Sequence, residues 1–138
     1  MTVKFSGGCL CGAVRYEGEA EPLFAGHCHC VDCRKAHSAG HASLMAVPKE
    51  ALQITGELKY YDRGADSGSV VSRAFCPTCG SNILNRPQRW PDLVVLSAAT
   101  FDDPDVFEPQ FVIFESRRPK WDEVAGDFPR FPEDPPQG

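Results

Sequence analysis

Cys28-His29-Cys30-Val31-Asp32-Cys33 is the middle of three cysteine clusters and lies between Cys9-Leu10-Cys11 and Cys76-Pro77-Thr78-Cys79. Together the three clusters contain all seven cysteines of the chain. Seven divides naturally into four and three. Four thiolates complete the tetrahedral shell of a structural zinc, whereas three leave one coordination position open for water or substrate. The clusters therefore predict two zinc ions per chain, one structural and one able to do chemistry.

The first and third clusters are predicted to share the structural zinc. In an extended segment, residues two apart project to the same face, so Cys9 and Cys11 direct both sulfurs one way. Cys76, Cys79 and the following Gly80 have the form of a zinc knuckle, in which the glycine lets backbone amides approach the sulfurs. The long separation in sequence is no obstacle. Each doubling of a loop costs only about 0.6 kcal/mol, whereas structural zinc contributes roughly 10–16 kcal/mol.

The middle cluster is predicted to hold the second zinc through Cys28, Cys30 and Cys33. Cys28 and Cys30 are two residues apart at the end of an expected strand, so they share a face. A short helix is expected over Asp32 to Ala36. Cys33 in its first turn would be biased towards the thiolate, because a helix N-terminus directs free N–H groups and a positive dipole end at that position.

Two other interpretations of the middle cluster stay open. A histidine could close the shell into a Cys₃His structural site, and the candidates are His27, His29, His37 and His41. In a strand, His29 points away from its two flanking cysteines, and His41 follows the short helix from which it could swing back. Alternatively, the three thiols form a reactive or redox site without metal.

Composition and pattern predict a single mainly β domain over residues 1–138, with very little helix. The length suits one domain, and 12 glycines and 12 prolines favour short strands joined by turns. The expected strands are Val3 to Phe5, Ala13 to Glu17, Leu23 to Cys30, Ala42 to Val47, Leu52 to Tyr61 with a turn at Gly56, Val70 to Phe75, Leu93 to Leu96 and Phe111 to Phe114. A loop is expected over Asp62 to Ser69, and the proline-rich tail over 128–138 is expected to be extended and partly mobile.

Charge and hydropathy restrict the partners. No apolar run approaches the roughly 20 residues of a membrane-spanning helix, and the first residues lack the apolar stretch of a secretory signal. We therefore expect a cytoplasmic protein without a membrane partner, and an odd cysteine count agrees with a reducing compartment. The formal net charge is −5. Nucleic-acid-binding proteins usually carry a basic surface, so no nucleic-acid partner is expected for this acidic chain.

The motifs also carry a family resemblance. The chain resembles the glutathione-dependent formaldehyde-activating (GFA) family, also called the centromere protein V/GFA domain, over roughly residues 3 to 131. The segments that carry the resemblance are Gly7-Gly8-Cys9-Leu10-Cys11-Gly12, Cys28-His29-Cys30-Val31-Asp32-Cys33, Arg73-Ala74-Phe75-Cys76-Pro77-Thr78-Cys79-Gly80, Phe101-Asp102-Asp103-Pro104 and Arg118-Pro119-Lys120-Trp121-Asp122.

This resemblance implies an Mss4-like, mainly β fold of short antiparallel strands around two zinc sites. It places the structural zinc on Cys9, Cys11, Cys76 and Cys79 and the catalytic zinc on Cys28, Cys30 and Cys33, the same division reached by counting ligands. The reaction that it implies condenses formaldehyde with glutathione to S-(hydroxymethyl)glutathione, a carbon–sulfur lyase type of activity.

The predicted function is a zinc-dependent carbon–sulfur lyase or synthase acting on a small-molecule thiol, such as glutathione, and a small aldehyde. Such chemistry needs a proton carrier, for which His29 and His41 are the candidates. The alternative is a non-catalytic zinc module that carries a thiol adduct or serves as a protein-interaction scaffold. The fourth ligand of the Cys28, Cys30 and Cys33 site distinguishes the two.

Overall fold

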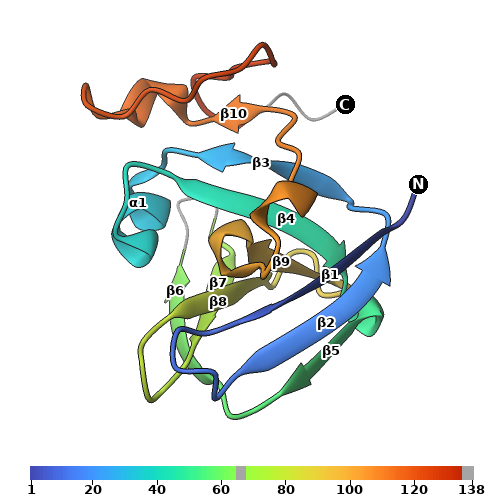
Figure 1. Ribbon diagram of the computed structural model, residues 1–138. Helices are drawn as coiled ribbons and strands as arrows, with labels where there is room; N and C mark the ends of the chain where they lie inside the picture. The colour runs from blue at the N-terminus through green and yellow to red at the C-terminus, as the bar shows by residue number, and fades with distance from the viewer. Residues whose placement is uncertain (65–67, 135–138) are drawn as a thin grey trace.

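The described residues form two β-sheets and one short α-helix. The computed structural model describes residues 1–64 and 68–134. The smaller sheet has three antiparallel strands in the order β1-β2-β5, and the larger has seven in the order β10-β3-β4-β9-β8-β7-β6. The strands are β1 (Val3–Gly8), β2 (Arg15–Ala20), β3 (Phe24–Cys28), β4 (Ala42–Pro48), β5 (Leu52–Thr55), β6 (Lys59–Gly64), β7 (Val70–Phe75), β8 (Asn82–Pro87), β9 (Leu93–Ser97) and β10 (Val112–Ile113). The prediction of a mainly β chain is confirmed (Figure 1).

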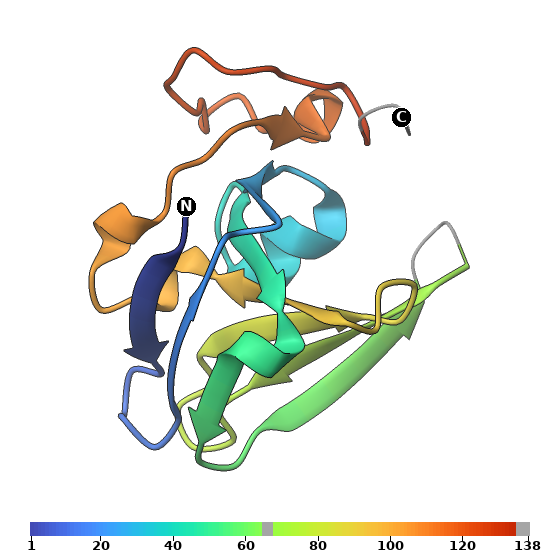
Figure 2. The same cartoon turned by 90° about the vertical axis from the view of Figure 1, so that its right-hand side faces the viewer.

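The main hydrophobic core lies between the two sheets (Figures 1 and 2). Phe5 of β1 and Tyr16 of β2 enter it from the smaller sheet, with Phe101 beside them; the three rings lie 5.9–6.4 Å apart between centroids. The larger sheet contributes a row of fully buried side chains that are register partners on neighbouring strands. The row is Ala74, Leu84, Leu96 and Met45.

The next row of the larger sheet points to the opposite face, because successive side chains of a strand alternate. Arg73 pairs with Asn85, Asn85 with Val95, and Val95 with Ala46. Ala42, four residues before Ala46 on β4, shares this face and pairs with Cys28. We call this the helix face, because the one α-helix covers it.

Helix α1 (Val31–His37) follows directly from β3. Cys30 is its N-cap and Ser38, with φ of 51°, ends it in the left-handed conformation. An ion pair of 3.2 Å between Arg63 Nε on β6 and Asp32 Oδ1 fastens α1 over the far edge of the sheet. The helix is thus one residue longer at each end than the predicted Asp32 to Ala36. In the part of the chain that the structure describes, the other helical elements are the 3₁₀ turns Lys49–Ala51, Ala98–Thr100, Pro104–Val106 and Glu115–Arg117.

The C-terminal segment runs along the outside of β3 (Figure 1). Strand β10 pairs with β3 in parallel, and the His27 amide donates to the Phe111 carbonyl at 3.0 Å. The chain then doubles back, so that the Phe131 amide donates to the Val112 carbonyl at 2.8 Å. The described part of the proline-rich tail is therefore extended and hydrogen-bonded. Its predicted mobility is not tested, and residues 135–138 lie outside the described part.

Several predicted boundaries were wrong by a few residues. The second strand begins at Arg15 rather than Ala13, because a tight turn returns the Cys9 amide to the Val14 carbonyl at 3.1 Å. The predicted loop from Asp62 to Ser69 is shorter, because β6 continues to Gly64 through pairing with β7; residues 65–67 are not described. Among the described residues, no helix is long and apolar enough to cross a membrane.

Candidate functional site

The outer cysteine cluster joins two turns that are distant in sequence. Cys9 and Cys11 lie in the turn between β1 and β2, and Cys76 and Cys79 lie in the turn between β7 and β8. Their four sulfurs lie within 4.8 Å of one another. The Sγ atoms of Cys9 and Cys11 are 3.6 Å apart, and those of Cys11 and Cys76 are 3.8 Å apart.

These sulfur separations suit a metal. A tetrahedral zinc with Zn–S bonds of about 2.3 Å holds its sulfurs about 3.8 Å apart. Backbone amides also point at the sulfurs: Val14 N donates to Cys9 Sγ at 3.2 Å and Thr78 N to Cys76 Sγ at 3.4 Å. The donor at Cys9 favours the thiolate of that residue. Burial opposes ionisation of Cys9, but hydrogen bonds led by that from Val14 N outweigh it and lower its pKa.

Ser81 stabilises the same turn. Its Oγ lies 3.3 Å from Cys79 Sγ and accepts a hydrogen bond from Leu10 N at 3.0 Å, so it links the two halves of the cluster. Hydrogen bonds from the Ser81 hydroxyl and backbone lower the pKa of Cys79 to about 5. Gly80 has φ of +79°, the left-handed conformation that a knuckle requires and that other residues rarely adopt.

The inner cysteine cluster is local. Cys28 ends β3, Cys30 caps α1 and Cys33 lies in its first turn, and their sulfurs lie within 4.8 Å of one another. Cys28 and Cys33 are buried, whereas Cys30 is partly exposed. Three soft donors in this arrangement fit a zinc or a similar metal ion. The two cysteine groups are therefore consistent with two zinc sites.

The thiolate bias falls on Cys30, not on the predicted Cys33. Cys30 Sγ accepts the Cys33 amide at 3.2 Å, so a sulfur takes the role of the N-cap. Hydrogen bonds with Cys28 and Cys33 lower the pKa of Cys30 to about 2. For Cys33, the bond with Cys28 favours ionisation, but the bond with Cys30 and burial together raise its pKa to about 12. Hydrogen bonding to Cys30 also raises the pKa of Cys28.

The two histidines predicted as proton carriers lie together, but on the opposite face from Cys28. His29 and His41 have ring centroids 5.3 Å apart, and His41 contacts His27, whose Nδ1 lies 3.0 Å from Ser43 Oγ. His27 and Ser43 alternate with Cys28 and Ala42 along paired strands, so the histidines project away from the inner sulfurs. This side is covered by the C-terminal segment.

Asp122 completes this histidine group and was not predicted. Its Oδ2 lies 2.6 Å from His41 Nδ1 and 3.6 Å from His29 Nδ1. His29 is fully buried, and its Nδ1 donates to the Gly40 carbonyl at 3.0 Å. Its Nε2 faces Glu115 Oε2 at 3.7 Å. His41, with 23% of its side chain exposed, is the accessible member. One ligand atom each from His29, His41 and Asp122 lies close enough to the others for a metal. However, the Nδ1 atoms of His29 and His41 are already occupied by hydrogen bonds.

His37 is the histidine on the same element as the inner cysteines. It follows Cys33 by four residues on α1, a spacing that places two side chains on one side of a helix. Burial and the nearby Arg73 guanidinium lower its pKa to about 4. The sequence signal was the i, i+4 spacing, which becomes informative only once the helix is known to extend to residue 37.

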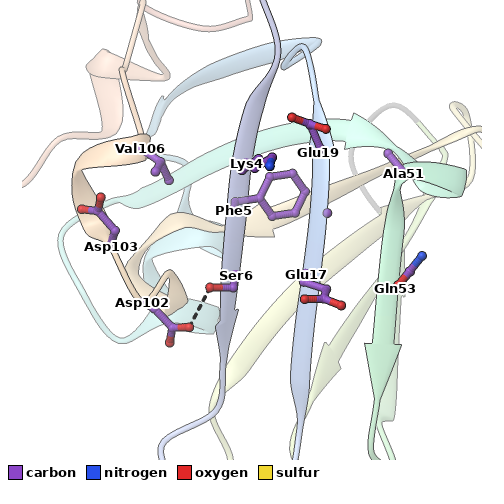
Figure 3. A pocket seen from close by; sticks show the side chains of 11 residues that line it. Lys4, Phe5, Ser6, Glu17, Glu19, Ala51, Gln53, Asp102, Asp103 and Val106 are labelled. Carbon is purple, nitrogen blue, oxygen red and sulfur yellow. Dashed lines mark hydrogen bonds between the residues drawn. The ribbon is translucent and has the colours of Figure 1, made fainter.

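A separate hollow of the described surface lies away from the cysteine clusters. It has a volume of about 520 Å³ and opens over β1, β2 and the beginning of β5, beside the segment from Asp102 to Val106 (Figure 3). Ser6 donates to Asp102 across one side of it at 2.8 Å. No cysteine or histidine lines this hollow, so it offers none of the soft ligands on which the chemistry of the clusters depends.

Comparisons with known proteins identify the family of the chain. The sequence matches the family described as "Glutathione-dependent formaldehyde-activating enzyme" over residues 4–117. A Halomonas elongata protein named "Putative glutathione-dependent formaldehyde-activating enzyme" is 31% identical over 124 residues, covering 86% of this chain and 79% of the relative. The crystal structure of a Rhodobacter sphaeroides protein is similar with a TM-score of 0.57 at 26% identity, covering 75% of this chain and 96% of that one. The chain therefore belongs to the glutathione-dependent formaldehyde-activating family.

Proposed function

We propose that the protein is a zinc-dependent carbon–sulfur lyase or synthase that joins a thiol such as glutathione to a small aldehyde such as formaldehyde. Family membership supports an enzyme of thiol and formaldehyde chemistry. The observation that carries the proposal is the inner cluster, in which three sulfurs converge without a fourth cysteine. Three protein ligands leave a position for substrate.

The proposal assigns one zinc to each cysteine cluster. Cys9, Cys11, Cys76 and Cys79 would hold a structural zinc, and Cys28, Cys30 and Cys33 a catalytic one. We also propose that the fold is Mss4-like and that residues 3–131 form one domain around both sites. Seven unpaired thiols favour a reducing compartment, so we propose a cytoplasmic location.

The reaction forms one bond between the thiol sulfur and the aldehyde carbon, and the thiol proton ends on the aldehyde oxygen. Zinc at the inner cysteines would supply the position where the thiol is held as its thiolate, the nucleophilic form. The chain's own contribution is to keep three sulfurs converging. The end of β3 fixes Cys28, while the first turn of α1 fixes Cys30 and Cys33.

We propose His41 as the proton carrier, with His29 beside it. Asp122 accepts the Nδ1 proton of His41 at 2.6 Å, which leaves Nε2 as the nitrogen that exchanges a proton. His29 is fully buried and is better suited to supporting His41 than to meeting substrate. Because both rings lie on the face opposite Cys28, the proposal requires the substrate to reach around the ends of β3 and β4.

The test is the rate of thiol–aldehyde exchange, measured by NMR with ¹³C-formaldehyde and glutathione, together with the zinc content. Wild-type protein with two zinc ions is expected to accelerate formation of S-(hydroxymethyl)glutathione above the spontaneous rate. Cys28→Ser should abolish the acceleration. An unaccelerated reaction in wild-type protein with two zinc ions would favour the non-catalytic zinc module, and full activity with two zinc ions in Cys28→Ser would reject the mechanism.

A further inference from the structure

Three buried polar atoms on neighbouring elements lack a hydrogen-bond partner among the described residues. They are Arg73 Nε on β7, Asn85 Oδ1 on β8 and His37 Nε2 on α1. Asn85 is only 6% exposed. A buried polar group without a partner is costly, so native proteins satisfy almost all of them, and an exception calls for an explanation such as a missing ligand.

Arg73 and Asn85 project from the helix face of the larger sheet, and His37 lies on the helix that covers this face. Arg73 and Asn85 are register partners on adjacent antiparallel strands, so their side chains project side by side. Arg63 stands two residues after Tyr61, the β6 partner of Arg73, and therefore on the same face. Its ion pair with Asp32 holds α1, and with it His37, over these strands.

This polar group adjoins the inner cysteine cluster. Arg73 lies close enough for its positive charge to favour the thiolates of Cys30 and Cys33 and the neutral form of His37, although hydrogen bonds among the cysteines and burial of His37 have larger effects. Arg73 also has no carboxylate within salt-bridge distance among the described residues, whereas Arg15, Arg63, Arg118 and Arg130 each have one. A partly buried guanidinium without a carboxylate partner among the described residues is thus near enough to act electrostatically on the inner cysteines.

We propose that Arg73 and His37 form a carboxylate-binding subsite for the thiol substrate, and that Asn85 Oδ1 accepts an N–H group of the same ligand. This inference rests on the proposed function. A guanidinium offers a planar pair of donors that matches a carboxylate, and the resulting charge-assisted hydrogen bonds are strong and directional. The substrate class is therefore a thiol that carries a carboxylate at some distance from its sulfur, with an amide or amine nearby.

The test compares two ligands with the same tripeptide skeleton by calorimetry on the zinc-loaded protein. Glutathione and glutathione diethyl ester share the thiol and the skeleton, but the ester lacks both negative charges. Wild-type protein is expected to bind glutathione about tenfold more tightly or better, as a charge-assisted contact predicts. Arg73→Gln should abolish this preference while retaining the affinity for the ester.

Arg86→Gln is the matched control. Arg86 lies on β8 next to Asn85, but it points to the other face, where its Nε donates to Tyr60 OH at 3.2 Å. This control should keep the wild-type preference. Zinc content and melting temperature are measured for every variant, and Arg73→Lys retains the charge if Arg73→Gln does not fold. The wild-type comparison of the two ligands is decisive even without a variant.

Three outcomes overturn the inference: equal binding of both ligands by wild-type protein, an unchanged preference in Arg73→Gln, or an equal loss for both ligands with reduced zinc. The last would make Arg73 a partner of the metal centre. S-methylglutathione, which keeps the carboxylates but has no free thiol, separates the inference from the proposed function. If S-methylglutathione binds as tightly as glutathione and loses this affinity in Arg73→Gln, the free thiol adds nothing to binding. In that case the proposed function fails and the carboxylate subsite stands.

Discussion

The two cysteine clusters use the same ligand chemistry but differ in how the chain builds them. The outer cluster draws Cys9 and Cys11 from one turn and Cys76 and Cys79 from another, and it connects the two sheets. The inner cluster lies within six consecutive residues, so its sulfurs stay close whenever α1 follows β3. We therefore expect the outer cluster to stabilise tertiary structure and the inner cluster to tolerate change with little effect on the fold.

The largest predicted effect comes from breaking the outer cluster. Cys76 is fully buried and its sulfur meets both the Thr78 amide and Cys11. Structural zinc contributes roughly 10–16 kcal/mol, as much as the whole free energy of unfolding of about 5–15 kcal/mol. Cys76→Ser is therefore expected to unfold the protein at room temperature, as measured by circular dichroism and zinc content. A cooperative melt at the wild-type temperature would contradict a stabilising role for this cluster.

The corresponding change in the inner cluster should preserve the fold. Cys33→Ser is expected to reduce bound zinc from two ions per chain to about one and to abolish catalysis, with a loss of stability of about 1–3 kcal/mol. Metal analysis, urea denaturation and the exchange assay measure the three quantities. Unfolding comparable to that of Cys76→Ser would remove the distinction between the clusters.

Changes in the histidine group should affect catalysis alone. His41→Asn is expected to lower the rate about 10²- to 10⁴-fold, the usual contribution of a general acid or base, and to leave zinc content unchanged. Gly40→Ala is a second way to the same result, because a β-carbon there would collide with the Asp122 carboxylate that holds His41. Wild-type rates in both variants would exclude His41 as the proton carrier.

The smallest effect concerns Tyr16 on β2, in the smaller sheet. Burial raises the pKa of Tyr16 to about 12, although the hydrogen bond to Thr100 opposes this. An unfolded tyrosine ionises near pH 10, so the stability linked to Tyr16 is complete below about pH 10 and is lost as the pH rises through about 12. The expected loss is roughly 2–3 kcal/mol.

Urea midpoints at pH 9 and pH 11.5 measure this loss. Tyr16→Phe should remove most of the difference between them, and Tyr61→Phe, at an exposed position, should not. If Tyr16→Phe shows the same difference between the two urea midpoints as wild-type protein, the alkaline sensitivity belongs to the cysteine ligands instead.

The sequence predicted the grouping of the cysteines because the spacing within each motif is local, and because motifs of two, three and two cysteines divide into four and three in one way. The spacing within each cluster directs the sulfurs of Cys9 and Cys11, or of Cys28 and Cys30, to one side. Both boundaries of strand β7 were predicted correctly, because the strand runs as an unbroken segment into the Cys76 knuckle. The thiolate in the inner cluster was misplaced by a small error: because α1 begins at Val31, Cys30 becomes the N-cap and receives the amide that was expected to favour Cys33.

The remaining site residues depend on contacts that no local pattern encodes. Asp122 reaches His41 from a segment without periodicity, anchored by a two-residue parallel strand. Arg73 and Asn85 become neighbours only through the register of β7 with β8. If that register were shifted by one residue, the two side chains would lie on opposite faces of the sheet.

The turn at the C-terminus has a practical consequence for shortening the chain. A protein cut after residue 117, where the family match ends, would keep all seven cysteines. It would lose the hydrogen bond of Asp122 to His41 and that of Arg130 to Glu115. It would also lose the backbone bonds that pair the residues around Val112 with those around Phe131. A boundary taken from sequence similarity thus cuts through a structural unit, and the truncated protein should retain both zinc ions while uncovering His29.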